Sequence, residues 1–192
     1  MTEIHGILLA AGSGRRFGRP KLLDPLPSGE SMAAAAARNL VSALPNALAV
    51  IRPGDHQLAQ TFETLGLVVV ENSEAQQGMG GSLARGIGAS ADASGWVVAL
   101  ADMPWILPET ILSVARALQG GASIAAPAYR GRRGHPVGFS RQWREPLQML
   151  RGDMGARQLL TAHPDELVLL PTDDSAVLLD IDHKHDLGLA DP

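Results

Sequence analysis

The chain has 192 residues, of which 45% are hydrophobic and 19% are charged, a balance that is typical of globular proteins and excludes wholesale disorder. Its formal net charge at pH 7 is −4, so a nucleic acid partner is not expected, because proteins that coat polyanions are usually basic. The absence of cysteine excludes disulfides, thiolate nucleophiles and cysteine-type zinc sites.

The sequence indicates neither membrane insertion nor secretion. No segment approaches the roughly 18 consecutive apolar residues of a membrane-spanning helix. Residues 1–7 lack the basic region followed by an apolar region that marks a secretory signal. Together with the lack of cysteine, these features predict a cytoplasmic protein without a membrane partner.

Short apolar runs alternate with longer segments of helical pattern. The runs are apolar throughout, as expected of strands covered on both faces, and predict strands at residues 4–10, 47–52, 67–71, 96–101 and 123–128. Between them the sequence predicts helices at residues 31–44, 55–65, 80–90 and 108–119. The less regular remainder predicts strands at residues 137–140, 167–170 and 177–181, and a helix at residues 153–163.

This alternation of strand and helix predicts an α/β fold, with a three-layer, mostly parallel, doubly wound (Rossmann-like) sheet. No linker is long enough to divide the chain, so we expect residues 1–192 to form one domain. In such sheets ligands lie beyond the carboxyl ends of the strands. Functional residues are therefore expected where the predicted strands end.

A glycine-rich segment follows the first predicted strand. The backbone N–H groups of such a turn can surround phosphate oxygens, and positive charge is supplied by Arg15, Arg16, Arg19 and Lys21. The Walker pattern is absent, and the pattern GxGxxG fails because its third glycine, expected at Phe17, stands at Gly18. We therefore expect a phosphate-binding turn of another kind; a tight turn with solvated arginines is the alternative.

Two other strand ends have polar groups. Residues 80–82 open a predicted helix and would present free N–H groups and a hydroxyl, although a glycine-rich helix start needs no ligand. Asp102 ends a buried apolar strand, where its charge needs a cation unless it caps the next helix. His135 alone would more often be structural, and the arginines at 130–133 before it are suited to a phosphate or to solvent.

Several motifs occur in the order of a known family. They are LAAGSGRRFG and PKLL (residues 9–18 and 20–23), QGMGGSL (77–83), ADMP (101–104), GHPVGF (134–139), GDMGAR (152–157) and LDID (179–182). Together they resemble the MobA-like nucleotidyltransferases, in particular the molybdenum cofactor cytidylyltransferase branch, over essentially the whole chain. The resemblance implies a sheet of the nucleotidyltransferase type, with a nucleotide-binding N-terminal part and an acceptor-binding C-terminal part.

The resemblance also implies roles for individual residues. The catalytic residues would be Arg16 and Lys21, which contact the triphosphate, and Asp102, which holds Mg²⁺ with Asp182 or, failing that, Asp180. The acceptor would be bound by His135, Pro136, Gly138 and Asp153. The nucleotide would be bound by Leu9, Ala10, Ala11, Gly12, Ser13, Gly14, Arg15, Gly18, Gly80 and Ser82. Residues 183–185 read His-Lys-His where the family has Thr-Pro-Glu, which puts the helix start there in doubt.

The implied reaction transfers CMP from CTP to the phosphate of a molybdopterin-type cofactor and releases pyrophosphate, with Mg²⁺ as cofactor. The methyl group of Ala11 stands where guanylyltransferase relatives carry glycine, and would favour cytosine by narrowing the base pocket. The expected partners are CTP or another nucleoside triphosphate, a phosphorylated pterin, and a molybdoenzyme or its maturation factor. We expect a monomer or a weak dimer.

Three other functions stay open. An NAD(P)-linked oxidoreductase of the nicotine blue type would use Arg52 for the NADP phosphate, but the displaced glycine and the lack of an acidic residue after the second strand argue against it. A guanylyl- or other sugar-phosphate nucleotidyltransferase shares the first motif but fits residues 134–139 and 152–157 less well. A non-catalytic cofactor chaperone would not need Lys21, Asp102 and Asp182.

Overall fold

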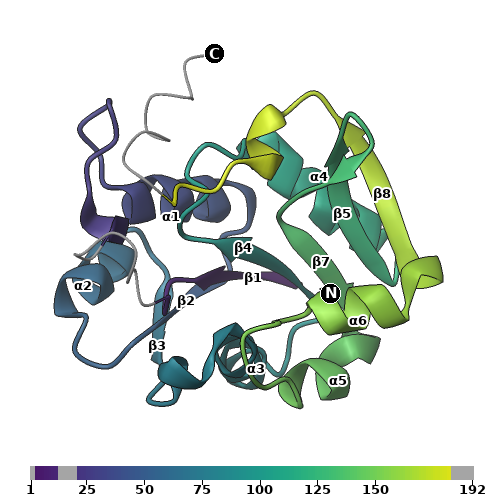
Figure 1. Cartoon of the computed structure of the whole chain (residues 1–192), viewed down its shortest axis with the longest axis horizontal. Helices are drawn as coiled ribbons and strands as arrows, with labels where there is room; N and C mark the ends of the chain where they lie inside the picture. Colours follow the sequence, from purple (N-terminus) through teal and green to yellow (C-terminus); the bar gives the residue numbers. More distant parts are fainter. Residues whose placement is uncertain (1–2, 13–20, 183–192) are drawn as a thin grey trace.

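Strands and helices alternate through the computed structural model, which describes residues 3–12 and 21–182 (Figure 1). The strands are β1 Ile4–Leu9, β2 Ala47–Ile51, β3 Val68–Glu71, β4 Gly95–Leu100, β5 Ile124–Tyr129, β6 Arg132–Arg133, β7 Val137–Ser140 and β8 Leu167–Thr172. The α-helices are α1 Met32–Ala43, α2 His56–Thr64, α3 Met79–Ala89, α4 Pro108–Gln119, α5 Arg144–Gln148 and α6 Arg157–Ala162. The 3₁₀ turns are η2 Lys21–Leu23, η3 Ala75–Gln77, η4 Arg141–Trp143, η5 Pro164–Glu166 and η6 Ser175–Leu178. Within these ranges no helix combines the length and apolar character needed to cross a membrane.

The strands form one mixed sheet. Its order is β3-β2-β1-β4-β7-β5-β6, and β8 pairs with β5. β1 is parallel to β2 and β4, β2 is parallel to β3, and β8 is parallel to β5. β7 runs antiparallel to its neighbours β4 and β5. Helices make the crossovers between the parallel strands β1 to β4, as such connections require. The predicted α/β class and mostly parallel sheet are therefore confirmed.

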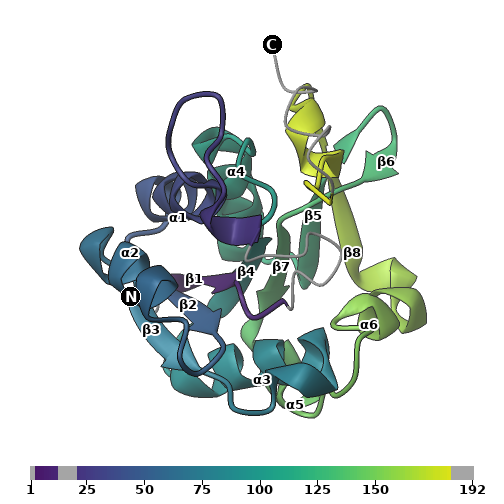
Figure 2. The same cartoon turned by 60° about the vertical axis from the view of Figure 1, so that its left-hand side comes forward.

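Helices cover both faces of the sheet, which gives the three layers visible in Figure 2. Successive residues of β1 point to opposite faces. Ile4 and Leu8 belong to the core beneath α1, α2 and α4, whereas Ile7 and Leu9 belong to the core beneath α3, α5 and α6. Burial on both sides explains why the central strands read as continuous apolar runs rather than as alternating patterns.

The strand predicted at residues 177–181 is wrong, because Ser175–Leu178 forms the 3₁₀ turn η6. The side chain of Asp174 explains this conformation. Its Oδ1 accepts the N–H of Ala176 at 3.0 Å, while its Oδ2 accepts the N–H of Leu107 at 3.0 Å and the hydroxyl of Thr110 at 2.7 Å. Asp174 thus caps η6 and fixes it to the start of α4.

The helix predicted at residues 153–163 is shorter in the structure and is confined to α6. Gly152 and Gly155 have φ angles of +71° and +52°, and these left-handed conformations prevent a helix from starting earlier. The preceding turn-rich segment also contains α5, which the irregular apolar pattern did not indicate.

Gly138 lies in β7 with its open side toward α4. A Cβ atom at this position would lie 2.6 Å from Val114 Cγ1 and 3.0 Å from Leu118 Cδ1. We predict that Gly138→Ala lowers the free energy of unfolding by about 1–3 kcal/mol, the usual cost of overpacking a core. Urea unfolding followed by circular dichroism measures this change.

Gly88→Ala is the matched control, because Gly88 lies in α3 and its added methyl group would be 3.8 Å from the nearest atom, Gln148 Nε2. This substitution should raise the free energy of unfolding by about 0.5–1 kcal/mol, since alanine favours the helix. A Gly138→Ala protein as stable as the wild type would contradict the close packing of β7 on α4.

Candidate active site

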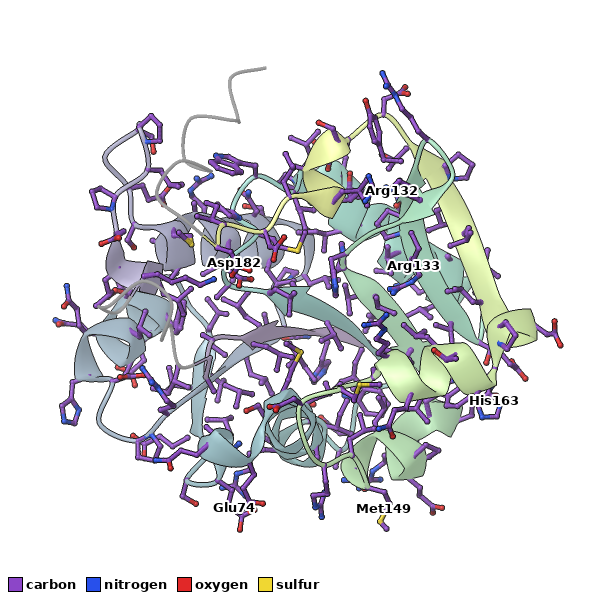
Figure 3. All side chains as sticks on the ribbon, viewed as in Figure 1. Glu74, Arg132, Arg133, Met149, His163 and Asp182 are labelled. Carbon is purple, nitrogen blue, oxygen red and sulfur yellow. The ribbon has the colours of Figure 1, made fainter. Side chains whose placement is uncertain are left out.

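Three charged side chains from distant parts of the chain meet beyond the end of β4. The ammonium of Lys21 donates to Asp102 Oδ2 at 3.0 Å, to Asp182 Oδ1 at 3.1 Å and to the carbonyl of Ile181 at 2.8 Å. Figure 3 shows Asp182 at the centre of the molecule, beside the sheet. The N–H of Ile181 donates to the carbonyl of Asp102 at 3.0 Å, and this bond aligns the last described segment with the end of β4.

Lys21 offsets part of the negative charge of the two carboxylates at this point. Its side chain is only 13% exposed, compared with 27% for Asp102 and 39% for Asp182. Burial by itself lowers the pKa of Lys21, but the charges and hydrogen bonds of the two aspartates outweigh it, and the pKa is raised. Lys21 therefore stays an ammonium at neutral pH and holds together two carboxylates that would otherwise repel each other.

Two carboxylate oxygens that converge on one cation form a donor set that fits Mg²⁺. This ion is usually held by one or two carboxylates, while phosphates and water complete its coordination. Within residues 3–12 and 21–182, no group of three or more His, Cys, Asp or Glu side chains could hold a metal. Two oxygens leave most of the coordination of a metal to other ligands, and a metal placed between them would have to displace the Lys21 ammonium.

A cavity of about 590 Å³ lies at the same ends of the strands. Its wall contains Leu9, Ala11, Gly12, Ser82 and Asp102, all of them predicted site residues. Ala10 is buried beneath it, and its N–H donates to the carbonyl of Val50 at 2.9 Å. The predicted residues that lie outside the described part of the chain are Ser13, Gly14, Arg15, Arg16 and Gly18.

The start of α3 packs tightly against residues 151–153. The N–H of Gly80 donates to the carbonyl of Gly152 at 2.8 Å, and a Cβ atom on Gly80 would lie 2.8 Å from the carbonyl oxygen of Arg151. Gly78 has a φ angle of +114°, and its Cβ would lie 2.5 Å from Asp153 Oδ1. Glycine is therefore needed where these segments meet. The structure places Gly80 at this contact rather than on the cavity wall.

Asn72 is a site residue that the sequence did not indicate. It is buried directly after β3, and its amide nitrogen donates to Ser82 Oγ at 3.1 Å. Its amide oxygen accepts the N–H of Glu74 at 3.0 Å, which fixes the side chain. Ser82 Oγ thus accepts one bond and keeps its own proton to donate into the cavity. The available signal was the position of Asn72 at the end of a predicted strand.

A second cavity, of about 370 Å³, adjoins the first. The two share Leu9, Met79, Leu100 and Asp153 as lining residues. The remaining wall of the second cavity is largely apolar but also contains Arg133, His135 and Arg157. An apolar wall with a few polar groups is typical of a small-molecule site. Two of the predicted acceptor-binding residues, His135 and Asp153, are therefore found together here.

His135 is held in this wall as a neutral imidazole. Burial and the positive charge of Arg133 lower its pKa to about 4, and Asp180 opposes this shift only in part. The backbone N–H of His135 donates to the carbonyl of Val177 at 2.9 Å, so η6 positions the residue. The negative charge of Asp180 thus affects the pKa of His135, whereas Asp182 forms an ion pair with Lys21, as Asp102 does.

The structure brings neither Pro136 nor Gly138 to either of these two cavities. Pro136 is buried, and Gly138 faces α4 on the other side of the sheet. The residues that line the second cavity are His135, Val137 and Phe139. Because side chains alternate along a strand, this segment presents only every second residue to the cavity.

Two adjoining cavities, with Lys21 and two carboxylates beyond the end of β4, define an α/β protein that has room for two small molecules side by side. The MobA-like NTP transferase domain matches residues 6–167 of the chain. The chain therefore belongs to this family, and the resemblance drawn from its motifs is confirmed.

Similar proteins carry different names. The nicotine blue oxidoreductase of Paenarthrobacter nicotinovorans is 29% identical over 188 residues, which cover 93% of this chain and 92% of the relative. The purine catabolism protein PucB of Bacillus subtilis (strain 168) is 30% identical over 190 residues, which cover 92% of this chain and 90% of PucB. The structure of Rv0371c of Mycobacterium tuberculosis H37Rv in complex with manganese has a TM-score of 0.82 and 25% identity, and covers 98% of this chain and 97% of Rv0371c.

Lys21→Met removes the cation that competes for Asp102 and Asp182. We predict that, without nucleotide, this variant binds Mn²⁺ about tenfold more tightly than the wild type, because the ammonium of Lys21 no longer competes with the metal for these carboxylate oxygens. Electron paramagnetic resonance of free Mn²⁺ measures the affinity. The double variant Lys21→Met/Asp102→Asn should lose the gain.

Arg38→Met serves as the control for removal of a positive charge. Arg38 forms its ion pair with Glu30 at 2.6 Å on the surface of α1, away from Lys21. Its loss should leave the Mn²⁺ affinity unchanged. If Lys21→Met binds Mn²⁺ no better than the wild type does, Lys21 does not occupy the metal position.

Proposed function

We propose that the protein is a Mg²⁺-dependent nucleotidyltransferase that transfers CMP from CTP to the phosphate of a molybdopterin-type acceptor and releases pyrophosphate. One observation carries the proposal: Asp102 and Asp182 converge on a single cation at a nucleotide-sized cavity, and a second cavity adjoins it. This arrangement suits a reaction between two bound molecules, at least one of them a polyanion.

In this proposal, the protein acts by position and charge. Asp102 and Asp182 would hold Mg²⁺, which when bound neutralises charge on the nucleotide phosphates. The backbone N–H groups that follow β1 bind phosphate oxygens. The ammonium of Lys21 leaves the two carboxylates and binds the triphosphate. Arg16, expected to contact the phosphates, adds positive charge. Such positioning and electrostatic stabilisation supply most of the acceleration in phosphoryl transfer.

The covalent step needs no nucleophile from the protein. An oxygen of the acceptor phosphate attacks the α-phosphorus of CTP, and a new P–O bond forms. The bond between the α-phosphorus and the bridging oxygen breaks, and the electron pair leaves with pyrophosphate. The absence of cysteine from the chain is compatible with this chemistry.

The choice of CTP is supported by Ala11, which lines the first cavity. Its methyl group takes space from the base, which favours the smaller pyrimidine ring. The hydroxyl of Ser82, fixed by Asn72, can donate to an acceptor atom of any base, so it supports nucleotide binding without selecting the base.

An NAD(P)-linked oxidoreductase is the second candidate, because the relative from Paenarthrobacter nicotinovorans carries that kind of name. Arg52 lines the first cavity, where it could meet an NADP phosphate. However, its guanidinium Nε already donates to Asp55 Oδ2 at 3.1 Å. This ion pair makes Arg52 less available for a second anion.

Pyrophosphate release is the direct test of the proposed reaction. The purified protein should release pyrophosphate from CTP in the presence of Mg²⁺ and molybdenum-loaded molybdopterin, and far less from GTP or ATP. We predict that Asp102→Asn lowers kcat at least about 100-fold, the scale of losing one electrostatic stabiliser, with an unchanged circular dichroism spectrum. Asp92→Asn is the control, since Asp92 lies exposed in the turn after α3.

The assay separates the candidates by its outcome. Pyrophosphate release from GTP alone would contradict the argument from Ala11. No release from any nucleotide, combined with saturable binding of NADPH in a fluorescence titration, would favour the oxidoreductase. Full activity of Asp102→Asn would remove this carboxylate from the reaction.

A further inference from the structure

Two arginines from different elements line the second cavity. Arg133 lies in β6 and Arg157 begins α6. Figure 3 shows Arg133 below the hairpin that contains β6, on the side toward α6. Both side chains are exposed, although both line the cavity. Partial burial lowers the pKa of Arg133, and the positive charge of Arg157 lowers it further.

Neither arginine has a counter-ion in the described part of the chain. The ion pairs there involve Lys21, Arg38 and Arg52. Asp153 lines the same cavity but forms no ion pair with Arg133 or Arg157. Two like charges that line one cavity without an ion pair favour the binding of an anion, although solvent screens part of their repulsion. An anion between them would relieve the repulsion and could accept hydrogen bonds from both guanidiniums.

The rest of this cavity is suited to an uncharged ring system. Leu83, Val98, Val137, Phe139 and Leu160 supply apolar surface. His135 is neutral at pH 7, so it offers a hydrogen bond without adding charge. The cavity of about 370 Å³ is within the range of pockets for small organic ligands. A compact heterocycle that carries an anionic group fits these walls better than an inorganic ion alone.

The arginine pair is separate from the reacting centre. Asp102 lines the first cavity only, whereas Arg133 and Arg157 line the second cavity only. In the proposed function, the attacking phosphate must lie near Asp102. The two arginines therefore address a different group of the acceptor.

We propose that Arg133 and Arg157 form an anion subsite for the acceptor, which is a compact heterocycle with a second anionic group remote from the phosphate that attacks. This inference rests on the proposed function in taking the second cavity as the acceptor site. It assigns the arginine pair to recognition of the acceptor, with no part in the chemical step.

Binding of fluorescent pterins tests the subsite without nucleotide, metal or turnover. Pterin-6-carboxylate carries an anion on a heterocycle, and unsubstituted pterin lacks it. The wild type should bind the carboxylate at least about tenfold more tightly than pterin, as expected of charge-assisted hydrogen bonds. Arg133→Gln and Arg157→Gln should each remove most of this preference, while binding of neutral pterin changes little.

Arg132→Gln is the matched control. Arg132 precedes Arg133 in β6 and is exposed as Arg133 is, but it does not line the cavity. The Arg132→Gln substitution removes the same charge from the same strand. If Arg132→Gln and Arg133→Gln both lose the preference for the carboxylate, the effect is one of net charge only, and the subsite is overturned. Equal affinity of the wild type for both pterins would overturn it as well.

The binding result is independent of the transfer reaction. If the carboxylate preference depends on Arg133 and Arg157 but no nucleotide yields pyrophosphate, the anion subsite stands and the proposed function fails. If CMP transfer occurs and the preference is absent, the proposed function stands and the subsite is wrong. Asp102→Asn should keep the preference in either case, because Asp102 does not line this cavity.

Discussion

The contact of one ammonium with two carboxylates organises the ligand-binding edge of this molecule. Lys21 comes from the segment before α1, Asp102 from the end of β4 and Asp182 from the segment after η6. The segment after η6 reaches the site because Asp174 fixes η6 to α4 and Ile181 bonds to the backbone of Asp102. A mostly buried cation thus sets the position of both acidic groups, and in the proposed function it is also the group that moves when a metal binds.

The two cavities are linked by packing as well as by position. Gly80 and Gly152 bring the start of α3, on the nucleotide side, into backbone contact with the segment that contains Asp153. His135 is bonded in turn to η6, the turn that precedes Asp182. A substitution that disturbs one cavity is therefore expected to disturb elements that also form the other.

The apolar pattern of the sequence was sufficient for the central parallel strands β1, β2 and β4, because burial on both faces leaves an unbroken signal. It failed at residues 177–181, where Asp174 supplies side-chain bonds that compete with strand pairing. The site was predictable where strands end, as at Asp102. Asn72 was signalled only by its position at the end of a predicted strand, whereas the meeting of Arg133 and Arg157 at one cavity depends on tertiary contacts that no local pattern encodes. Gly138 belongs to the same motif as His135. The alternation of side chains along residues 135–139 places His135 at the cavity and Gly138 against α4.

The central claim is that Lys21 moves from the two carboxylates to the triphosphate while a metal takes its place. A crystal structure with CTP and Mn²⁺ tests this claim most directly. Anomalous scattering locates the Mn²⁺ ion, and the electron density shows the Lys21 side chain. We predict Mn²⁺ between Asp102 and Asp182, with the ammonium of Lys21 on the triphosphate. Mn²⁺ elsewhere, with both Lys21 ion pairs intact in the nucleotide complex, would contradict the account.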